Sequence, residues 1–327
     1  AVRAEVPTSP VAVAPSLQVW QKPIPVAAAV VLSAIATGLG VWMSIPTNVD
    51  PVSRFNYELP SDQSFQNSSR SLVAFSPDGS RFIYNTIEGL YLRSLDTEQA
   101  RLLSGTNANV RNPVFSPDGE WITYFSNLDQ ALKKIAVTGG APVTLTEATL
   151  PFGVSWEDDG FVLFGQPSGV MRVSENGGAA ELLVEARDGE QIDGPQLLPG
   201  EEWVLFSSTT AGGNNRWNEG NVVAESVETG ERRQLISGGS DARYLPTGHI
   251  VYALENVLFA IGFDLGGMEV VGGPVSVVEG VERANSPQSN TGTGHFSVSA
   301  EGNLVYVEAG TALGSERALA LVDRNGP

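Results

Sequence analysis

The hydrophobic residues of this chain come in short runs that alternate with turn residues. The runs are rich in Val, Ile, Phe, Tyr and Trp, and Gly, Pro, Asp or Asn bounds them on both sides. β-branched and aromatic residues favour strands, and breaks of this kind favour tight turns. Six of the runs share one position relative to a turn: FIYNT from Phe82, WITYF from Trp121, FVLFG from Phe161, WVLFS from Trp203, IVYAL from Ile250 and LVYVE from Leu304. The pattern predicts strands throughout this part of the chain.

A turn motif precedes each of these six runs. The segment FSPDG at 75–79 recurs unchanged at 115–119, and four further segments keep its layout. Gly tolerates a positive φ and Asp accepts a hydrogen bond from the backbone two residues on, so the motif predicts a tight hairpin. The turns lie near 76–79, 116–119, 157–160, 198–201, 245–248 and 299–302. A period of about forty residues at the start indicates a repeat architecture.

Two further strand-like runs follow in most repeats, such as LYLRSL at 90–95 and ARLLS at 100–104. Four short antiparallel strands in one repeat describe a blade of a β-propeller. A single such sheet cannot bury both of its faces, whereas sheets stacked around an axis can. The sequence therefore predicts an all-β fold, a propeller of about six four-stranded blades. A pair of β-sandwiches is the alternative, but it would not require one turn motif at a fixed period.

The sixth repeat lacks a fourth strand, because its last strand-like run lies near 319–323. The blade is therefore either incomplete or closed by the segment RFNYEL at 54–59, acting as its outer strand. In the second case the two ends of the propeller would pair in one sheet.

An uncharged apolar stretch, IPVAAAVVLSAIATGLGVWMSI, precedes the repeats at 24–45. Twenty-two helical residues rise about 33 Å, enough to cross a hydrocarbon core of about 30 Å. Trp20 and Trp42 lie at its ends, where aromatic rings prefer the headgroup region. A signal peptide and a buried core helix are the alternatives. We predict a Pro/Ala-rich linker at 1–22, a transmembrane helix at 23–46 and the propeller at 47–327.

The basic residues Arg3 and Lys22 precede the predicted membrane helix. The positive-inside rule therefore places the N-terminus in the cytoplasm. We expect a single-pass protein of the inner membrane whose propeller lies on the periplasmic or extracellular side.

Charge and composition exclude several classes of function. The net charge is −18, from 37 acidic and 19 basic residues, and such a surface repels the phosphates of nucleic acid. The chain has no Cys and only two His, at 249 and 295, so we expect no metal and no cofactor. The acidic run 157–159 lacks the spacing of a calcium loop and is interpreted as a solvated hairpin turn. The aromatic residues at 75, 115, 156 and 244 are interpreted as packing between blades.

A small ligand is expected at the mouth of the central channel of such a propeller. The starts of the innermost strands converge there and supply five candidate contacts: Arg111, Phe152, Asp193, Asp241 and His295. The segments 208–220 and 281–294 are longer than the repeat requires, and loops of this kind often carry binding. The expected partner is a protein or a small molecule at one face of the propeller.

The repeated FSPDG turns resemble the WD-like repeats of TolB-type propellers. The segment GSDARYLPTGHIVY at 239–252, with GAPVT at 140–144, FSVS at 296–299 and LVDRNG at 321–326, resembles the extracytoplasmic propellers of bacterial membrane-bound serine/threonine protein kinases. The order of linker, membrane helix and propeller is similar as well. The resemblance implies a cytoplasmic kinase domain before residue 1, a sensor role for the propeller, and further blades after residue 327.

No kinase motif is present in the chain itself. We therefore expect no enzyme activity from the residues present, and a sensor or interaction role that works through dimerisation. Two alternatives stay open: an envelope binding or scaffold propeller without a kinase, and the propeller half of a prolyl-type peptidase.

Overall fold

The computed structural model describes residues 37, 53–66, 68–107, 109–213, 215–284, 291–310 and 318–323. The predicted linker at 1–22 and the predicted membrane helix at 23–46 lie outside this part, apart from residue 37. Within the described part, no helix has both the length and the apolar character needed to cross a bilayer. Every strand belongs to one compact unit, which begins at Pro51.

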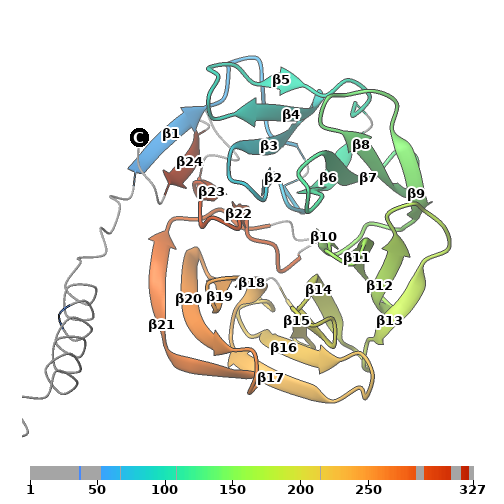
Figure 1. The fold of residues 1–327 in the computed structure, drawn as a ribbon, viewed down its shortest axis with the longest axis vertical. Helices are drawn as coiled ribbons and strands as arrows, with labels where there is room; N and C mark the ends of the chain where they lie inside the picture. Colours follow the sequence, from blue (N-terminus) through green and yellow to red (C-terminus); the bar gives the residue numbers. More distant parts are fainter. Residues whose placement is uncertain are drawn as a thin grey trace, which may run out of the picture. The chain divides into compact units, whose positions relative to one another are not determined.

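The strands form six antiparallel sheets of four strands, arranged around a central axis (Figure 1). The first blade contains β2 (Val73–Phe75), β3 (Arg81–Thr86), β4 (Gly89–Ser94) and β5 (Arg101–Leu102). The second contains β6 (Val110–Phe115), β7 (Trp121–Ser126), β8 (Ala131–Ala136) and β9 (Val143–Glu147). The third contains β10 (Val154–Trp156), β11 (Phe161–Gln166), β12 (Gly169–Ser174) and β13 (Glu181–Glu185).

The remaining blades follow the same order from the inside outward. The fourth contains β14 (Gln191–Leu197), β15 (Trp203–Thr209), β16 (Asn221–Ser226) and β17 (Arg232–Ser237). The fifth contains β18 (Ser240–Leu245), β19 (His249–Leu254), β20 (Val257–Asp264) and β21 (Glu269–Glu279). The sixth contains β22 (Phe296–Val298), β23 (Leu304–Val307), β24 (Ala318–Asp323) and β1 (Ser53–Glu58). The predicted six-bladed propeller is confirmed.

The ring closes in the sixth blade, where the first strand pairs with the last. β1 lies antiparallel to β24, with Ser53 opposite Asp323 and Glu58 opposite Ala318. Of the two possibilities that the sequence left open for this blade, the structure shows closure by the segment that includes residues 54–58. Strands from both ends of the propeller share one sheet, so the described blades form an uninterrupted circle (Figure 1).

The turn motif forms the hairpin that its residues predict. In the first blade the Ser76 hydroxyl donates to Asp78 at 2.6 Å, and the Ser80 amide donates to the same carboxylate at 3.1 Å. Gly79 has a φ of +66°, which favours glycine over other residues. The turn locks the innermost strand to the second strand in the register that the repeat requires.

The core lies between the blades, with a buried cluster at each interface between neighbours. Ala74 and Ile83 of the first blade join Phe115 and Ile122 of the second in one buried cluster. The middle strands carry most of the buried residues, because blades cover both of their faces. Packing of this kind explains why the hydrophobic runs are continuous and do not alternate with polar residues.

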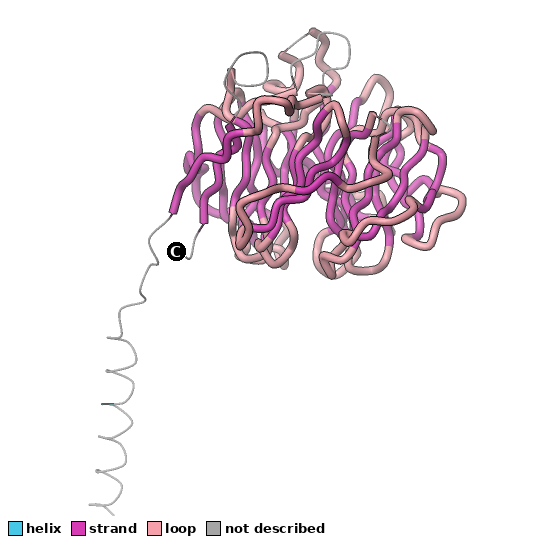
Figure 2. The backbone as a smooth tube through the Cα atoms, turned by 90° about the horizontal axis from the view of Figure 1, so that it is seen from above, coloured by secondary structure: helices cyan, strands magenta, loops and turns pink. Residues whose placement is uncertain are grey.

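The six innermost strands all run in the same direction, so the central channel has two different ends. We call the end at which these strands begin the strand-start end, and the end that carries the FSPDG-type turns the turn-motif end. The described parts of the connections 59–72 and 280–295 and of the hairpin 210–220 lie at the strand-start end, which is uppermost in Figure 2. Ser53 and Asp323 pair at the turn-motif end.

Candidate ligand site in the central channel

The five residues predicted as channel contacts all lie at the strand-start end. Arg111, Asp193 and Asp241 are near the starts of β6, β14 and β18. Phe152 lies two residues before β10, and His295 directly precedes β22. The structure buries Asp193, Asp241 and His295 and leaves Arg111 and Phe152 half-buried. Other parts of the chain cover Asp193, Asp241 and His295. The contact of all five residues with a ligand stays a prediction.

The segment 291–294 lies at the strand-start end and contacts the first, fourth and fifth blades. The Thr291 hydroxyl donates to the Ser69 carbonyl at 2.9 Å, on the approach to the first blade. The Gly294 amide donates at 2.9 Å to the carboxylate of Asp241, in the fifth blade. A Cβ on Gly292 would lie 3.0 Å from the Asp193 carboxylate, so this position favours glycine. The segment therefore closes this end of the channel.

The buried side chain of Arg70 connects separate segments at the same end through hydrogen bonds to their backbone. Its side chain is 1% exposed and donates to the carbonyls of Pro151 at 2.8 Å, Ser69 at 2.8 Å and Leu150 at 3.2 Å. Its guanidinium lies 4.9 Å from the centre of the Phe152 ring. Burial lowers the pKa of Arg70 to about 10, so the side chain stays charged at neutral pH. Arg70 thus links the first blade to the start of the third.

Asp193 and Asp241 form a buried acidic pair under this cover. Burial raises the pKa of both carboxyls, and the charge of Asp241 raises that of Asp193 further. Arg243 Nη2 lies 2.6 Å from Asp241 Oδ1, and the charge of Arg283 also acts on both carboxyls. Neither oxygen of Asp193 has a hydrogen-bond partner among the described residues. Asp193 therefore carries the less satisfied charge of the pair.

His295 is also fully buried at this end. Its Nε2 donates to the Ser68 carbonyl at 3.0 Å, which fixes the proton on that nitrogen. Burial lowers the pKa of His295 to about 4. The imidazole is therefore neutral at physiological pH and acts here as a buried hydrogen-bond donor.

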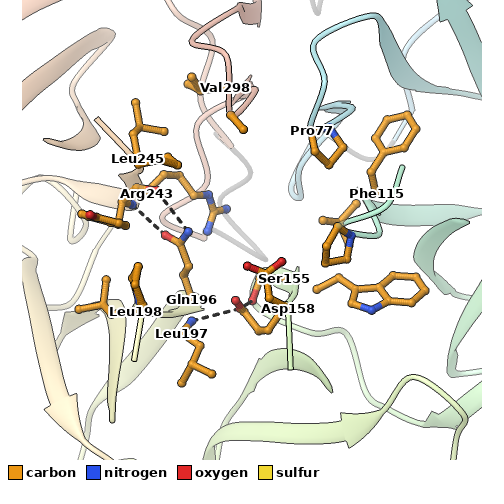
Figure 3. Close-up of a pocket in the computed structure, with 18 of the residues that line it drawn as sticks. Pro77, Phe115, Ser155, Asp158, Gln196, Leu197, Leu198, Arg243, Leu245 and Val298 are labelled. Carbon is orange, nitrogen blue, oxygen red and sulfur yellow. Dashed lines mark hydrogen bonds between the residues drawn. The ribbon is translucent and has the colours of Figure 1, made fainter. Parts of the chain in front are cut away.

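The turn-motif end, in contrast, contains a cavity of about 660 Å³. Its walls come from the ends of the inner strands and from the turns that follow them (Figure 3). Phe115, Trp156, Leu198 and Tyr244 supply apolar surface, and the cavity reaches the protein surface beside the exposed Asp158. The volume is within the range of about 300–1,000 Å³ that is typical of small-molecule sites.

Three polar side chains in the cavity wall are held in place by their neighbours. Gln196 accepts a hydrogen bond from the Tyr244 amide at 2.8 Å and donates to the Tyr244 carbonyl at 3.3 Å. Arg243 is fixed by its ion pair with Asp241. Glu157 accepts hydrogen bonds from the Ser155 hydroxyl and from the Leu197 amide, the latter at 3.1 Å. These contacts join the third blade to the fourth and the fourth to the fifth (Figure 3).

Glu157 corrects the sequence interpretation of its turn. The run 157–159 is solvated at Asp158, but Glu157 is only 9% exposed. Burial raises the pKa of Glu157 to about 7. The signal was present in the repeat, because the second position of the motif is buried in most of the other blades, as Ser76 and Ser116 show. A carboxylate at this position had to be buried as well.

The aromatic residues at the first motif position pack between blades, as predicted, but they also line the cavity. Phe75, Phe115 and Trp156 are buried in inter-blade clusters, and with Tyr244 they form part of the cavity wall. Within the described residues, no group of three or more Asp, Glu or His is placed to hold a metal ion.

Comparison with known proteins gives the fold and no closer relationship. No protein-family profile and no curated sequence matches the chain. Among solved structures, a protein assigned as a gluconolactonase has a TM-score of 0.55 at 13% identity, covering 84% of this chain and 94% of its own. A protein from Agrobacterium tumefaciens assigned as TolB has a TM-score of 0.53 at 16% identity, covering 83% and 97%. A streptogramin B lyase has a TM-score of 0.51 at 12% identity, covering 83% and 98%.

These similarities support the TolB-like propeller fold and correct one expectation. We expected no enzyme activity from the residues present, because kinase motifs are absent. Two of the similar propellers are described as a gluconolactonase and a lyase, so propellers of this fold include enzymes. The expectation was therefore wrong, because the absence of kinase motifs does not argue against catalysis in a fold that includes other enzymes. At this level of identity no particular activity is transferred.

Proposed function

We propose that this propeller binds a ligand in its central channel and that the ligand enters from the turn-motif end. The observation that carries the proposal is the cavity of about 660 Å³, whose apolar walls surround the fixed side chains of Glu157, Gln196 and Arg243. Apolar walls with a few convergent polar groups are typical of ligand sites. At the opposite end, segment 291–294 and Arg70 cover the channel. A small molecule, or a side chain of a protein partner, fits this arrangement.

The proposal extends to the setting in which the ligand is bound. We propose that the propeller is the extracytoplasmic sensor of a single-pass membrane protein, with a serine/threonine kinase as the cytoplasmic part. The apolar stretch 24–45 and the resemblance of residues 239–252 support this proposal. Alkaline phosphatase fused after residue 327 should be active in bacterial cells if the propeller is exported. An inactive fusion that is stable and present at the same level would contradict this location.

Filling the channel tests the binding proposal directly. Ser155 lines the cavity from β10, so Ser155→Trp should occupy the space without changing a buried contact of the outer strands. The probe is 1-butanol. Its binding to the full chain in zwitterionic lipid nanodiscs is measured as the saturation-transfer NMR signal of the alcohol. We expect the transfer signal to fall at least fivefold in Ser155→Trp.

The matched control is Leu182→Trp, on the outer strand β13 of the same blade, where the side chain is 49% exposed. This variant should keep the signal of the unmodified protein. An equal signal in Ser155→Trp and in the control would show that 1-butanol does not occupy the channel, and the proposal would be wrong.

A further inference from the structure

The charges around the cavity have one predominant sign. Glu157, Asp158, Asp159 and Glu201 line it, against the single cation Arg243. Arg243 already lies 2.6 Å from Asp241, so an acid behind the cavity wall offsets its charge. A bound anion would face these carboxylates with no uncompensated cation among the described lining residues. The lining therefore favours a cation.

Glu157 offers a cation one free carboxylate oxygen. Both hydrogen bonds that it accepts go to Oε1, from Ser155 and from Leu197. Oε2 has no hydrogen bond within the described part of the chain. A buried carboxylate is costly unless a partner compensates its charge. A primary ammonium group carries a full positive charge and three donors, which suits the remaining oxygen.

The rest of the cavity suits an apolar body attached to that charge. Phe115, Trp156, Leu198 and Tyr244 form part of the wall, and Pro77 and Pro117 extend it towards the surface. Proline has no backbone N–H and offers no donor to an anionic or strongly polar ligand. Aliphatic or aromatic carbon would be buried against these side chains.

We infer that the channel cavity is a site for an organic cation, a primary ammonium group on an apolar chain, with the ammonium paired to Glu157. The ligand class includes free alkylamines and the lysine side chain of a partner. The inference rests on the proposed function, since it names the ligand chemistry of the same cavity. It adds that charge selects the ligand and that Glu157 is the selecting residue.

Three probes of equal length separate charge from shape: butylamine, 1-butanol and butyrate. Each is titrated into the full chain in zwitterionic nanodiscs and followed by saturation-transfer NMR at pH 8. We expect butylamine to bind at least tenfold more tightly than 1-butanol. Any butyrate signal should be the same in the unmodified protein and in Ser155→Trp, because butyrate should not enter the channel. N-acetyl-lysine-methylamide is the fourth probe, and binding comparable to butylamine would extend the site to partner lysines.

The variant Glu157→Gln removes the charge but keeps an acceptor for Ser155 and Leu197. Butylamine affinity should fall to that of 1-butanol, while 1-butanol affinity stays within twofold and reports an intact cavity. Glu228→Gln is the matched control, because it removes the same charge at an exposed turn outside the cavity. Its butylamine affinity should stay within twofold of the unmodified protein.

The pH dependence gives an independent readout. Butylamine remains cationic between pH 6 and 8, whereas Glu157 loses its proton over that range. Butylamine affinity should therefore rise with pH in the unmodified chain and stay flat in Glu157→Gln.

Two outcomes would overturn the inference. In one, butylamine binds no better than 1-butanol although Ser155→Trp removes both signals, so the proposed function survives and the charge selection fails. In the other, butylamine affinity is unchanged in Glu157→Gln. If Ser155→Trp lowered the signal of none of the probes, no probe would occupy the channel, and the proposed function itself would be contradicted.

Discussion

The two ends of the central channel are built from the same six strands, yet they treat charge differently. At the strand-start end, Arg70, Arg243 and Arg283 surround the buried acids Asp193 and Asp241. At the turn-motif end, Glu157 faces a cavity whose one basic residue is already paired. The charges at the strand-start end are buried among one another, whereas the Glu157 carboxylate borders a cavity that a ligand can enter. On this difference rests the proposal that the strand-start end is structural and the turn-motif end binds the ligand.

The largest effect should come from breaking the closed end at Arg70. Arg70→Met keeps an apolar stem but leaves the carbonyls of Leu150 and Pro151 without their donor and removes a cation from beside Asp193. We expect the free energy of unfolding to fall by about 3–5 kcal/mol. Urea denaturation followed by tryptophan fluorescence measures the change.

Arg187→Ala is the control for that experiment, because Arg187 is exposed. Its effect should stay within about 0.5 kcal/mol. If Arg70→Met were equally mild, the strand-start end would not depend on compensated charge, and the contrast between the ends would fail.

A smaller effect, of opposite sign, is expected at Asp193. Burial raises the pKa of Asp193 in the folded state, so this carboxyl contributes most below its unfolded pKa and costs stability as pH rises towards neutrality. Asp193→Asn removes that cost. From pH 4 upward, the free energy of unfolding of the variant should increasingly exceed that of the unmodified protein. The full difference is about 1.4 kcal/mol for each unit by which the pKa is raised.

Asp241→Asn is the matched comparison for Asp193. Asp241 accepts the Gly294 amide and lies against Arg243, so neutralising it removes favourable contacts as well as a buried charge. At pH 8, Asp241→Asn should raise the free energy of unfolding by less than Asp193→Asn does. Urea denaturation across the pH range measures both changes. Equal gains for the two variants would contradict the assignment of Asp193 as the less satisfied charge.

The smallest effect is expected at Asp118, which is exposed in the turn of the second blade. Asp118 accepts hydrogen bonds from the Ser116 hydroxyl and, at 3.0 Å, from the Glu120 amide, and these bonds lower its pKa. Asp118→Ala should cost about 1 kcal/mol at neutral pH. The lowered pKa means that this contribution is lost as pH falls through the folded pKa, so the variant and the unmodified protein should converge in acid.

Thermal unfolding at pH 7 and at pH 3 measures the Asp118 effect, with Asp96→Ala as an exposed control. A loss as large as that of Arg70→Met would show that the turns, rather than the closed end, limit the stability of the ring.

The blade repeat could be predicted from sequence because each turn motif fixes its own hairpin locally. Closure by residues 54–59 could be recognised as one of two possibilities, because one strand was missing from the last repeat. The convergence of Arg111, Asp193 and Asp241 followed from topology, since inner strands of the same direction begin at the same end. These features depend on local pattern and on the symmetry of the fold.

The rest depends on contacts between distant segments. The cover by 291–294 requires the close approach of Gly292 to Asp193, which no local pattern specifies. The outer strand β21 (Glu269–Glu279) has 11 residues, and its pairing with β20 changes register at two places. Glu157 could have been identified by comparing its position with Ser76 and Ser116, but its cavity arises only when six turns meet.

The pairing of β1 with β24 has a consequence for how the protein folds. Ser53 and Asp323 belong to neighbouring strands but are separated by almost the whole length of the propeller. During synthesis β1 emerges first, and it has no partner until β24 has been made. Contacts between residues so far apart in sequence form slowly. Until that last pairing the edge of β24 stays open, so newly made chains are most exposed to pairing with one another in the interval before the circle is complete.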